Sequence, residues 1–123
     1  MLISRAETMA KQQDFRNLAL ALPGSEEKSH FGKPDFRVRN KIYAGFTAQG
    51  HVYVKLKPEQ QEMVCDSEAG VVRPIPGGWG NQGWTGIDLA VADRALLESL
   101  INMAWKNVAP KSIVKAHARL ERD

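Results

Sequence analysis

The sequence predicts an α+β fold, a two-layer sandwich in which helices cover one face of an antiparallel sheet. Apolar residues recur at helical spacing near both ends of the chain. Between them, residues 35–57 alternate apolar and polar side chains and contain short polar breaks, which is typical of antiparallel strands. Because such strands are flanked by helices, we expect the helices on one sheet face and the order α-β-β-β-α-β-β-α. Residues 1–123 are expected to form a single domain.

The first half of the chain contains one helical pattern and three strand patterns. The helix is expected over residues 5–22, because Phe15, Leu18 and Leu22 share one face and Pro23 follows. Short links between the strands indicate a meander. The strands are expected at residues 35–39, 42–46 and 51–57, with turns at 40–41 and 48–50.

The second half repeats the alternation of helix and strand. Pro58 is suited to the first turn of a short helix that runs to residue 66. Asp93 is a good N-cap for the last strong helix, whose apolar stripe runs from Leu97 to Val108. Further elements are expected as strands at 71–73 and 85–89 and as one or two helical turns at 111–120.

Composition narrows the class of protein. The hydrophobic fraction is 43% and the charged fraction 25%, as in ordinary globular domains, and no apolar run approaches the ~20 residues of a membrane span. A single cysteine, Cys65, excludes an internal disulfide and favours a reducing, cytoplasmic setting. His30, His51 and His117 have no carboxylate or cysteine at motif spacing. We therefore expect no metal, no cofactor and no enzymatic activity.

Charge is distributed unevenly along the chain. Residues 28–57 contain seven Lys and Arg side chains and one acid, whereas residues 58–105 contain two bases and seven acids. The last segment, residues 106–123, is basic again. Such asymmetry is compatible with an anionic partner, although most charged runs are only solvated faces.

Several sequence signatures occur in order over residues 18–115. They are Leu22-Pro23-Gly24 with Glu26-Glu27, Phe31-Gly32-Lys33-Pro34-x-Phe36-Arg37-Val38 with Lys41-Ile42, Leu56-Lys57-Pro58-Glu59-Gln60-Gln61, Gly78-Trp79-Gly80-x-x-Gly83-Trp84-Thr85, and Ala104-Trp105-x-x-Val108-Ala109-Pro110-Lys111. In these the chain resembles the MmcQ/YjbR family of small bacterial proteins. The resemblance implies a CyaY-like or secretion-chaperone-like α-β3-α-β2-α fold and a kinship with double-wing DNA-binding structures. It brings no catalytic motif.

Strand alternation predicts which side chains lie on the open face of the sheet. Basic residues interleaved with aromatic ones suit nucleic acid, because cations offset phosphate charge and rings stack on bases. The alternatives are a polar face that is merely solvated, or a surface for a protein partner, with the chain a monomer or weak dimer. The expected helix-covered side chains are Phe36, Val38, Ile42, Ala44, Phe46, Val52, Val54 and Leu56. The candidate phosphate contacts are Arg37, Arg39, Lys55 and Lys57, and the candidate stacking residues are Tyr43, Tyr53 and Trp84.

Residues 74–86 form a loop rich in Pro, Gly and Trp. Prolines fix φ and glycines permit positive φ, so the segment is a shaped connection rather than a helix. We expect Trp79 to anchor it in the core, with Gly78, Gly80 and Gly83 as structural residues and Trp84 more exposed. The alternative is a small-ligand pocket lined by one of the two rings.

Overall fold

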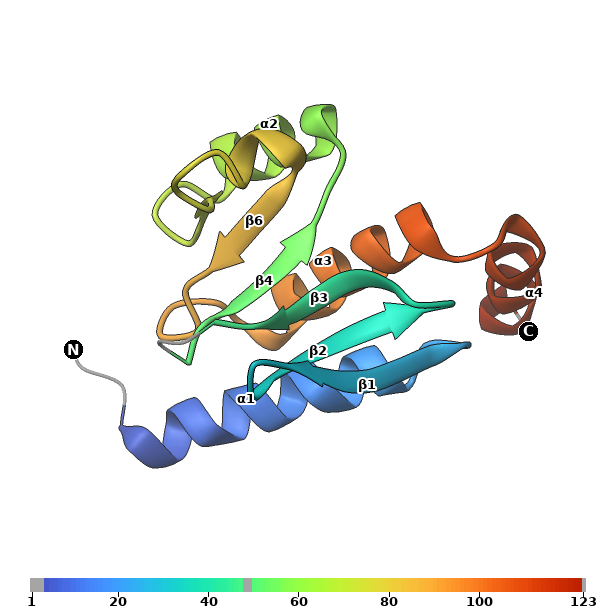
Figure 1. Cartoon of the computed structure of the whole chain (residues 1–123), viewed down its shortest axis with the longest axis horizontal. Coiled ribbons are helices and arrows are strands. Elements are labelled where there is room, and N and C mark those ends of the chain that lie inside the picture. The colour runs from blue at the N-terminus through green and yellow to red at the C-terminus, as the bar shows by residue number, and fades with distance from the viewer. Residues whose placement is uncertain (1–3, 48–49, 123) are drawn as a thin grey trace.

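A computed structural model describes residues 4–47 and 50–122 of the chain, so Ala48 and Gln49 of the expected turn at 48–50 lie outside the described residues. The sheet has six antiparallel strands in the order β1-β2-β3-β4-β6-β5 (Figure 1). The predicted fold class and the order of helices and strands are confirmed, with one additional strand, β1, at the edge of the sheet. The strands are β1 (Ser25–His30), β2 (Lys33–Val38), β3 (Lys41–Phe46), β4 (Val52–Lys55), β5 (Val72–Pro74) and β6 (Trp84–Ile87).

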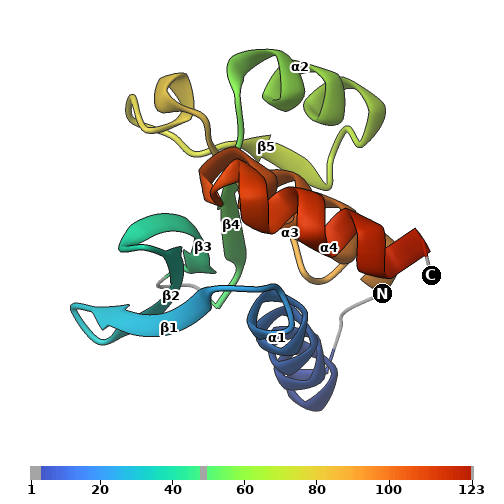
Figure 2. The ribbon, with the colours of Figure 1, turned by 90° about the vertical axis from the view of Figure 1, so that its right-hand side faces the viewer.

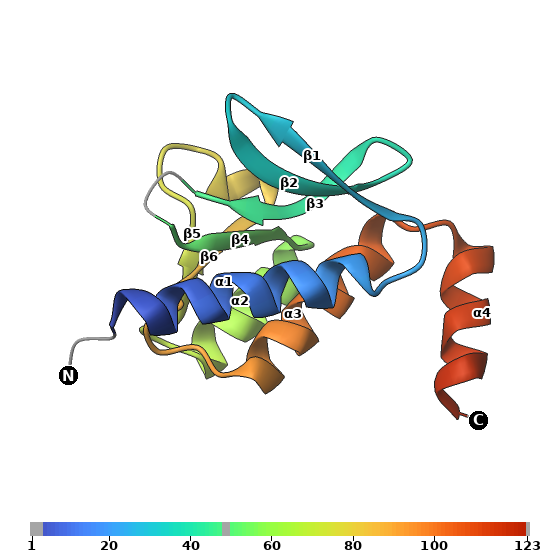
Figure 3. The same cartoon turned by 90° about the horizontal axis from the view of Figure 1, so that it is seen from below.

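Helices α1 and α3 lie side by side on one face of the sheet, and the opposite face is left open (Figure 3). Helix α2 packs against β5, and a short 3-10 helix precedes β6. The helices are α1 (Arg5–Leu20), α2 (Pro58–Ser67), α3 (Arg94–Val108), α4 (Lys111–Arg122) and the 3-10 helix η1 (Gly80–Gln82).

Helix starts follow local capping chemistry. Ser4 Oγ accepts the backbone N–H of Glu7 at the start of α1, and Asp93 Oδ1 accepts the N–H of Leu96 at the start of α3. Pro58 occupies the first position of α2, where its missing N–H costs nothing. The sequence located all three starts to within one residue.

The core lies between the sheet and helices α1 and α3. Phe15 of α1 meets Phe36 and Phe46 with ring centroids 6.0 and 5.8 Å apart. Trp105 of α3 is fully buried and donates its indole N–H to Pro23 O at 3.0 Å. Six side chains expected on this face are buried as predicted: Phe36, Val38, Ala44, Val52, Val54 and Leu56.

Strand β1 has no apolar alternation, which is why its sequence does not resemble a strand. Its side chains on the helix side form hydrogen bonds instead of burying apolar surface. Ser25 Oγ lies 2.7 Å from Tyr43 Oη, and Glu27 Oε1 accepts a hydrogen bond from Arg16 Nε on α1 at 2.9 Å. Pairing with β2 along its whole length then completes the strand.

Two-residue turns join the first three strands. Arg39 and Asn40 have φ of 49° and 68°, and Phe31 and Gly32 have φ of 52° and 77°. Positive φ at both central residues is the mark of type I′ hairpin turns. The expected strand end at Arg39 is therefore wrong, because this residue lies in the turn.

Helix α4 packs across one end of the domain at an angle to α1 and α3 (Figures 2 and 3). Its Ile113 side chain lies near Gly24, and the His117 imidazole meets the Trp105 ring edge to face at 5.2 Å. His117 Nε2 is 2.7 Å from Glu121 Oε1 but makes no hydrogen bond to it. The helix is longer than the one or two turns expected from sequence.

Candidate binding groove on the open sheet face

Strand register defines the open face. One row of paired residues crosses all six strands, and it has a glycine on each side of Tyr53. Because glycine has no side chain, the Tyr53 ring lies down over the neighbouring strand instead of standing upright. From edge to edge, this row comprises Lys28, Asp35, Gly45, Tyr53, Gly86 and Arg73.

A groove of about 610 Å³ occupies this face. Its floor comes from β2, β3, β4 and β6, and its wall from the loop that follows β5. That volume falls within the range of ordinary ligand sites, and most of the lining is apolar or aromatic. The lining residues are Lys33, Asp35, Ile42, Phe46, Thr47, Tyr53, Ile75, Pro76, Trp79 and Trp84.

Trp79 projects into solvent at the wall of this groove. Its side chain is 57% exposed, whereas Trp84 is only partly exposed and Trp105 is fully buried. The expectations that Trp79 anchors the loop in the core and that Trp84 is the more exposed ring are therefore both wrong. The physical reason is that backbone hydrogen bonds and close glycine packing hold the loop, so the loop needs no buried ring.

The loop backbone is fixed from both sides. Ile75 N–H donates to Trp84 O at 2.9 Å, and Gly80 N–H donates to Ile75 O at 2.9 Å. A side chain at Gly80 would collide with the Ile75 carbonyl, and one at Gly83 would overlap the carbonyl of Leu56. The predicted structural role of glycines in this loop agrees with these contacts at Gly80 and Gly83, whereas Gly78 faces open space at φ 89°.

The side chain of Gln61 on α2 forms hydrogen bonds to the same loop. Its Nε2 donates to Gly80 O at 3.0 Å and to Thr85 Oγ1 at 3.0 Å. This residue was not selected from the sequence. Its position in the motif Lys57-Pro58-Glu59-Gln60-Gln61 on an amphipathic helix was the available signal, but helical spacing alone does not show what the amide contacts.

Trp84 is packed on two sides. Its ring meets Tyr53 edge to face at 5.3 Å, and Lys55 Nζ lies 5.1 Å from its centroid. The cation over the ring is attracted by the ring quadrupole. Three of the predicted nucleic-acid-binding residues, Tyr53, Lys55 and Trp84, are thus brought together. Trp84 itself is a supporting residue rather than a free stacking surface.

An ion pair between Arg37 and Asp35 lies at the β2 end of the groove. Arg37 Nε and Nη2 donate to the Asp35 carboxylate at 2.7 and 3.0 Å, and Nη1 donates to Asn40 Oδ1 at 2.8 Å. The hydrogen bond to Asp35 raises the pKa of Arg37, while burial opposes the shift. Asp35 neutralises the charge that Arg37 was expected to offer to a phosphate. Sequence reasoning missed this role of Asp35, although residues two apart on a strand share a face.

Tyr43 is not on the open face. It is fully buried toward the helices, where its Oη lies 2.7 Å from Ser25 Oγ and donates to Ala19 O at 3.2 Å. Phe36 pairs with Ala44 but Arg37 pairs with Ile42, so the strand contains a β-bulge. Because of the bulge, the consecutive residues Tyr43 and Ala44 are both buried, which strict alternation does not allow.

The same bulge places Ile42 in the groove instead of the core. Burial also raises the pKa of Tyr43 to about 12. An extra residue in one strand breaks the strict alternation of faces, so Ile42 and Tyr43 change face while Ala44 keeps its predicted one. Hydrophobic alternation alone did not reveal this.

Two other predicted phosphate contacts lie away from the groove lining. Arg39 lies in the exposed β2–β3 turn, and Lys57 is the exposed N-cap residue of α2. Both remain solvent-facing cations, but neither lines the groove.

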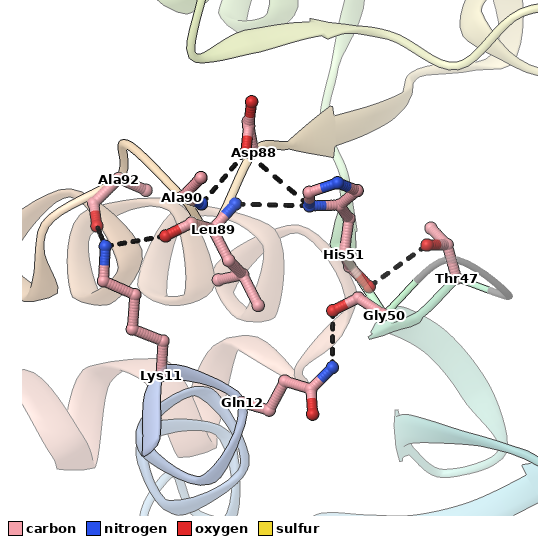
Figure 4. Close-up of polar contacts among 9 residues, drawn as sticks. All are labelled: Lys11, Gln12, Thr47, Gly50, His51, Asp88, Leu89, Ala90 and Ala92. Carbon is pink, nitrogen blue, oxygen red and sulfur yellow. Dashed lines mark hydrogen bonds and ion pairs between the residues drawn. The ribbon is translucent and has the colours of Figure 1, made fainter. Parts of the chain in front are cut away.

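Polar contacts connect the His51 end of the open face, helix α1 and the loop between β6 and α3 (Figure 4). Leu89 N–H donates to His51 Nδ1 at 3.4 Å, and Asp88 Oδ1 lies 3.7 Å from the same nitrogen. Lys11 Nζ of α1 donates to the carbonyls of Leu89 and Ala92 at 2.6 and 2.9 Å. This part of the sheet is held in place by contacts between segments far apart in the chain.

Comparison with known proteins identifies the family. The sequence model of the YjbR family matches residues 20–107, which is more than half of the chain and includes all six strands. The chain belongs to the YjbR family. Helix α4 lies beyond the part of this YjbR chain that the model matches.

A solved structure shows the same fold. The crystal structure of Deinococcus radiodurans protein DR2400, which carries the family-model domain DUF419, is 21% identical to this YjbR chain. The two share a TM-score of 0.62 over 76% of this chain and 74% of that one. No curated protein sequence matches the chain. Within residues 4–47 and 50–122, no helix is long and apolar enough to cross a membrane.

Proposed function

We propose that this YjbR protein is a non-enzymatic binding protein whose open-face groove takes an unstacked nucleotide unit of single-stranded nucleic acid. The observation that supports the proposal best is the exposure of Trp79 on a fixed backbone beside an apolar groove. A large ring held in solvent by a rigid loop gives up burial energy that a core position would supply. Such exposed aromatic residues are typical of binding surfaces.

The chemistry of the groove suits a base with its phosphate. Every base has a π-face, and stacking on an aromatic side chain contributes about 1–3 kcal/mol per base. Lys33 lines one end of the groove and Lys55 lies beside Trp84, so cations flank the aromatic floor. A base inside a duplex cannot present its face to Trp79, so we expect single strands to be preferred.

The electrostatic contribution is expected to be modest. Asp35 compensates Arg37, and Lys55 is already engaged with the Trp84 ring. Few phosphates can be neutralised, so the salt dependence of binding should be shallow compared with that of strongly basic proteins. The free Cys65 on α2 accords with the reducing cytoplasm in which we propose that the protein acts.

The test uses anisotropy of a labelled single-stranded oligodeoxyadenylate, with the matching duplex as competitor. We expect Trp79→Ala to weaken binding by at least about fivefold, the equivalent of one lost stacking contact. Phe31→Ala is the matched control, because Phe31 is a 90% exposed aromatic residue on a different turn. Added salt should weaken binding measurably.

Two results would contradict the proposed function. Equal effects of the Trp79 and Phe31 substitutions would overturn the role of the groove. Binding of a protein or peptide through Trp79 with no response to salt, together with no nucleic-acid binding, would support the alternative of a protein-interaction module.

A further inference from the structure

A second hollow, of about 270 Å³, lies on the same face and is lined in part by Gly86 of β6; we call it the Gly86 hollow. Gly86 pairs with Tyr53 on one side and with Arg73 on the other, so a position without a side chain is flanked by two long ones. His51 and Asp88 also line it. Gly86 has no side chain that could occupy this part of the sheet surface.

Two hydrogen-bond donors border the hollow. Arg73 is exposed, and its guanidinium has no ion-pair or hydrogen-bond partner among the described residues. His51 Nδ1 accepts the N–H of Leu89 at 3.4 Å, which leaves Nε2 as the ring nitrogen free to donate a hydrogen bond. Guanidinium and imidazole N–H groups together suit an oxyanion.

Asp88 is the opposing charge at this site. Its Oδ1 accepts the N–H of Ala90 at 2.9 Å, which directs that oxygen toward the backbone. It also lies 3.7 Å from His51 Nδ1. Asp88 is the acidic side chain among the lining residues, and Arg73 supplies the positive charge next to the hollow.

The two hollows are neighbours. Thr47, Ile75 and Pro76 line both the Gly86 hollow and the Trp79 groove. We propose that the Gly86 hollow is an anion subsite that binds the phosphate of the nucleotide whose base stacks on Trp79, with Arg73 as the main contact. This inference rests on the proposed function and adds the position of the phosphate and the residue that recognises it.

The experiment compares adenosine with adenosine 5′-monophosphate, titrated into the wild-type protein and into Arg73→Gln, Gly86→Val and Arg39→Gln. We expect the monophosphate to bind about tenfold more tightly than adenosine, as one charge-assisted contact implies. Arg73→Gln should remove that difference and leave adenosine affinity unchanged. Arg39→Gln, which removes an exposed charge from the β2–β3 turn, should change neither affinity.

Gly86→Val provides a second, steric test. A Cβ at Gly86 would lie 3.1 Å from Ile75 Cδ1 and would begin to fill the hollow. We expect it to reduce monophosphate affinity about as much as Arg73→Gln does, with folding checked by circular dichroism. If this variant does not fold, the Arg73→Gln result alone tests the anion subsite.

The outcomes separate the two proposals. Equal affinities for adenosine and its monophosphate, or equal effects of Arg73→Gln and Arg39→Gln, would overturn the anion subsite while Trp79-dependent binding of adenosine and of oligodeoxyadenylate still stands. No Trp79-dependent binding of either small ligand or of oligodeoxyadenylate would overturn both. An Arg73 effect on the monophosphate alone assigns the subsite to a terminal phosphate, and an effect on oligodeoxyadenylate as well assigns it to a phosphodiester.

Discussion

The ring of Tyr53 on β4 lies over the backbone of Gly45 on β3, and a Cβ at Gly45 would come within 2.6 Å of Tyr53 Cζ. This contact closes the sheet surface beneath the groove. Burial raises the pKa of Tyr53 to about 12, with the neighbouring Asp35 adding to the shift and Arg37 opposing it.

Substitution of Gly45 by alanine should displace the Tyr53 ring. We expect Gly45→Ala to lower the free energy of unfolding by about 1–3 kcal/mol, the usual cost of overpacking. Urea denaturation measures this change in the free energy of unfolding. In a Tyr53→Ala background the same substitution should cost little, because alanine is intrinsically preferred to glycine in a strand. Equal costs in the two backgrounds would show that the ring is not the obstacle.

The glycines of the loop should differ in their tolerance of a side chain. Gly83 has φ of 96° and no room for a Cβ beside the Leu56 carbonyl, so Gly83→Ala should cost about 3 kcal/mol or more. Gly78 also has positive φ, but nothing lies within 4 Å of a Cβ there. Gly78→Ala should therefore cost only about 1–2 kcal/mol, the backbone strain alone. Thermal unfolding of both variants checks the order, and a reversed order would contradict the described loop.

Stability should fall at alkaline pH because of Tyr43. Its folded-state pKa of about 12 is higher than the ordinary value near 10, so the neutral phenol is the form that favours folding. This contribution is fully present below pH ~10 and is lost as the pH rises through the folded pKa near 12.

Tyr43→Phe should weaken that alkaline loss. At neutral pH the variant should be less stable by about 1 kcal/mol, because the hydroxyl contacts to Ser25 and Ala19 disappear. Denaturation at several pH values, together with tyrosinate absorbance, measures both effects. An unchanged alkaline slope in the variant would assign the loss to other groups.

The β2–β3 turn offers a stabilising substitution. Arg39 adopts φ of 49°, which asparagine tolerates better than arginine. We expect Arg39→Asn to raise the free energy of unfolding by about 0.5–1 kcal/mol. Arg39→Gln is the control, because it removes the same charge without easing the backbone. A similar gain in both variants would indicate charge repulsion rather than turn geometry as the cause.

Local signals in the sequence were sufficient for most of the elements. The helical stripe from Leu97 to Val108, the Asp93 cap and the Pro58 start all depend on interactions within a few residues, and each is present in the structure. Strand β1 was missed because its partners, Arg16 and Tyr43, come from other elements. Strand alternation placed Tyr53 correctly and Tyr43 incorrectly, and the β-bulge accounts for the difference.

The candidate site was predictable only in part. A basic and aromatic face was anticipated, and Tyr53, Lys55 and Trp84 do meet on it. The exposure of Trp79 could not be read from the chain, because glycine and proline show that a loop is shaped but not which way its side chains point. Likewise, the sequence does not show that Asp35 neutralises Arg37 or that Gly86 leaves a hollow beside Arg73.

The sequence by itself therefore determined the family, the α+β class and the capped helices, because these depend on local propensity and on the period of apolar residues. Only the tertiary structure decided which side of the sheet carries each ring and charge. This decision depends on how neighbouring strands pair and pack. It includes the strand register, the β-bulge at Tyr43 and the packing of glycines against Tyr53 and Ile75. Their energies arise only when the strands are brought together.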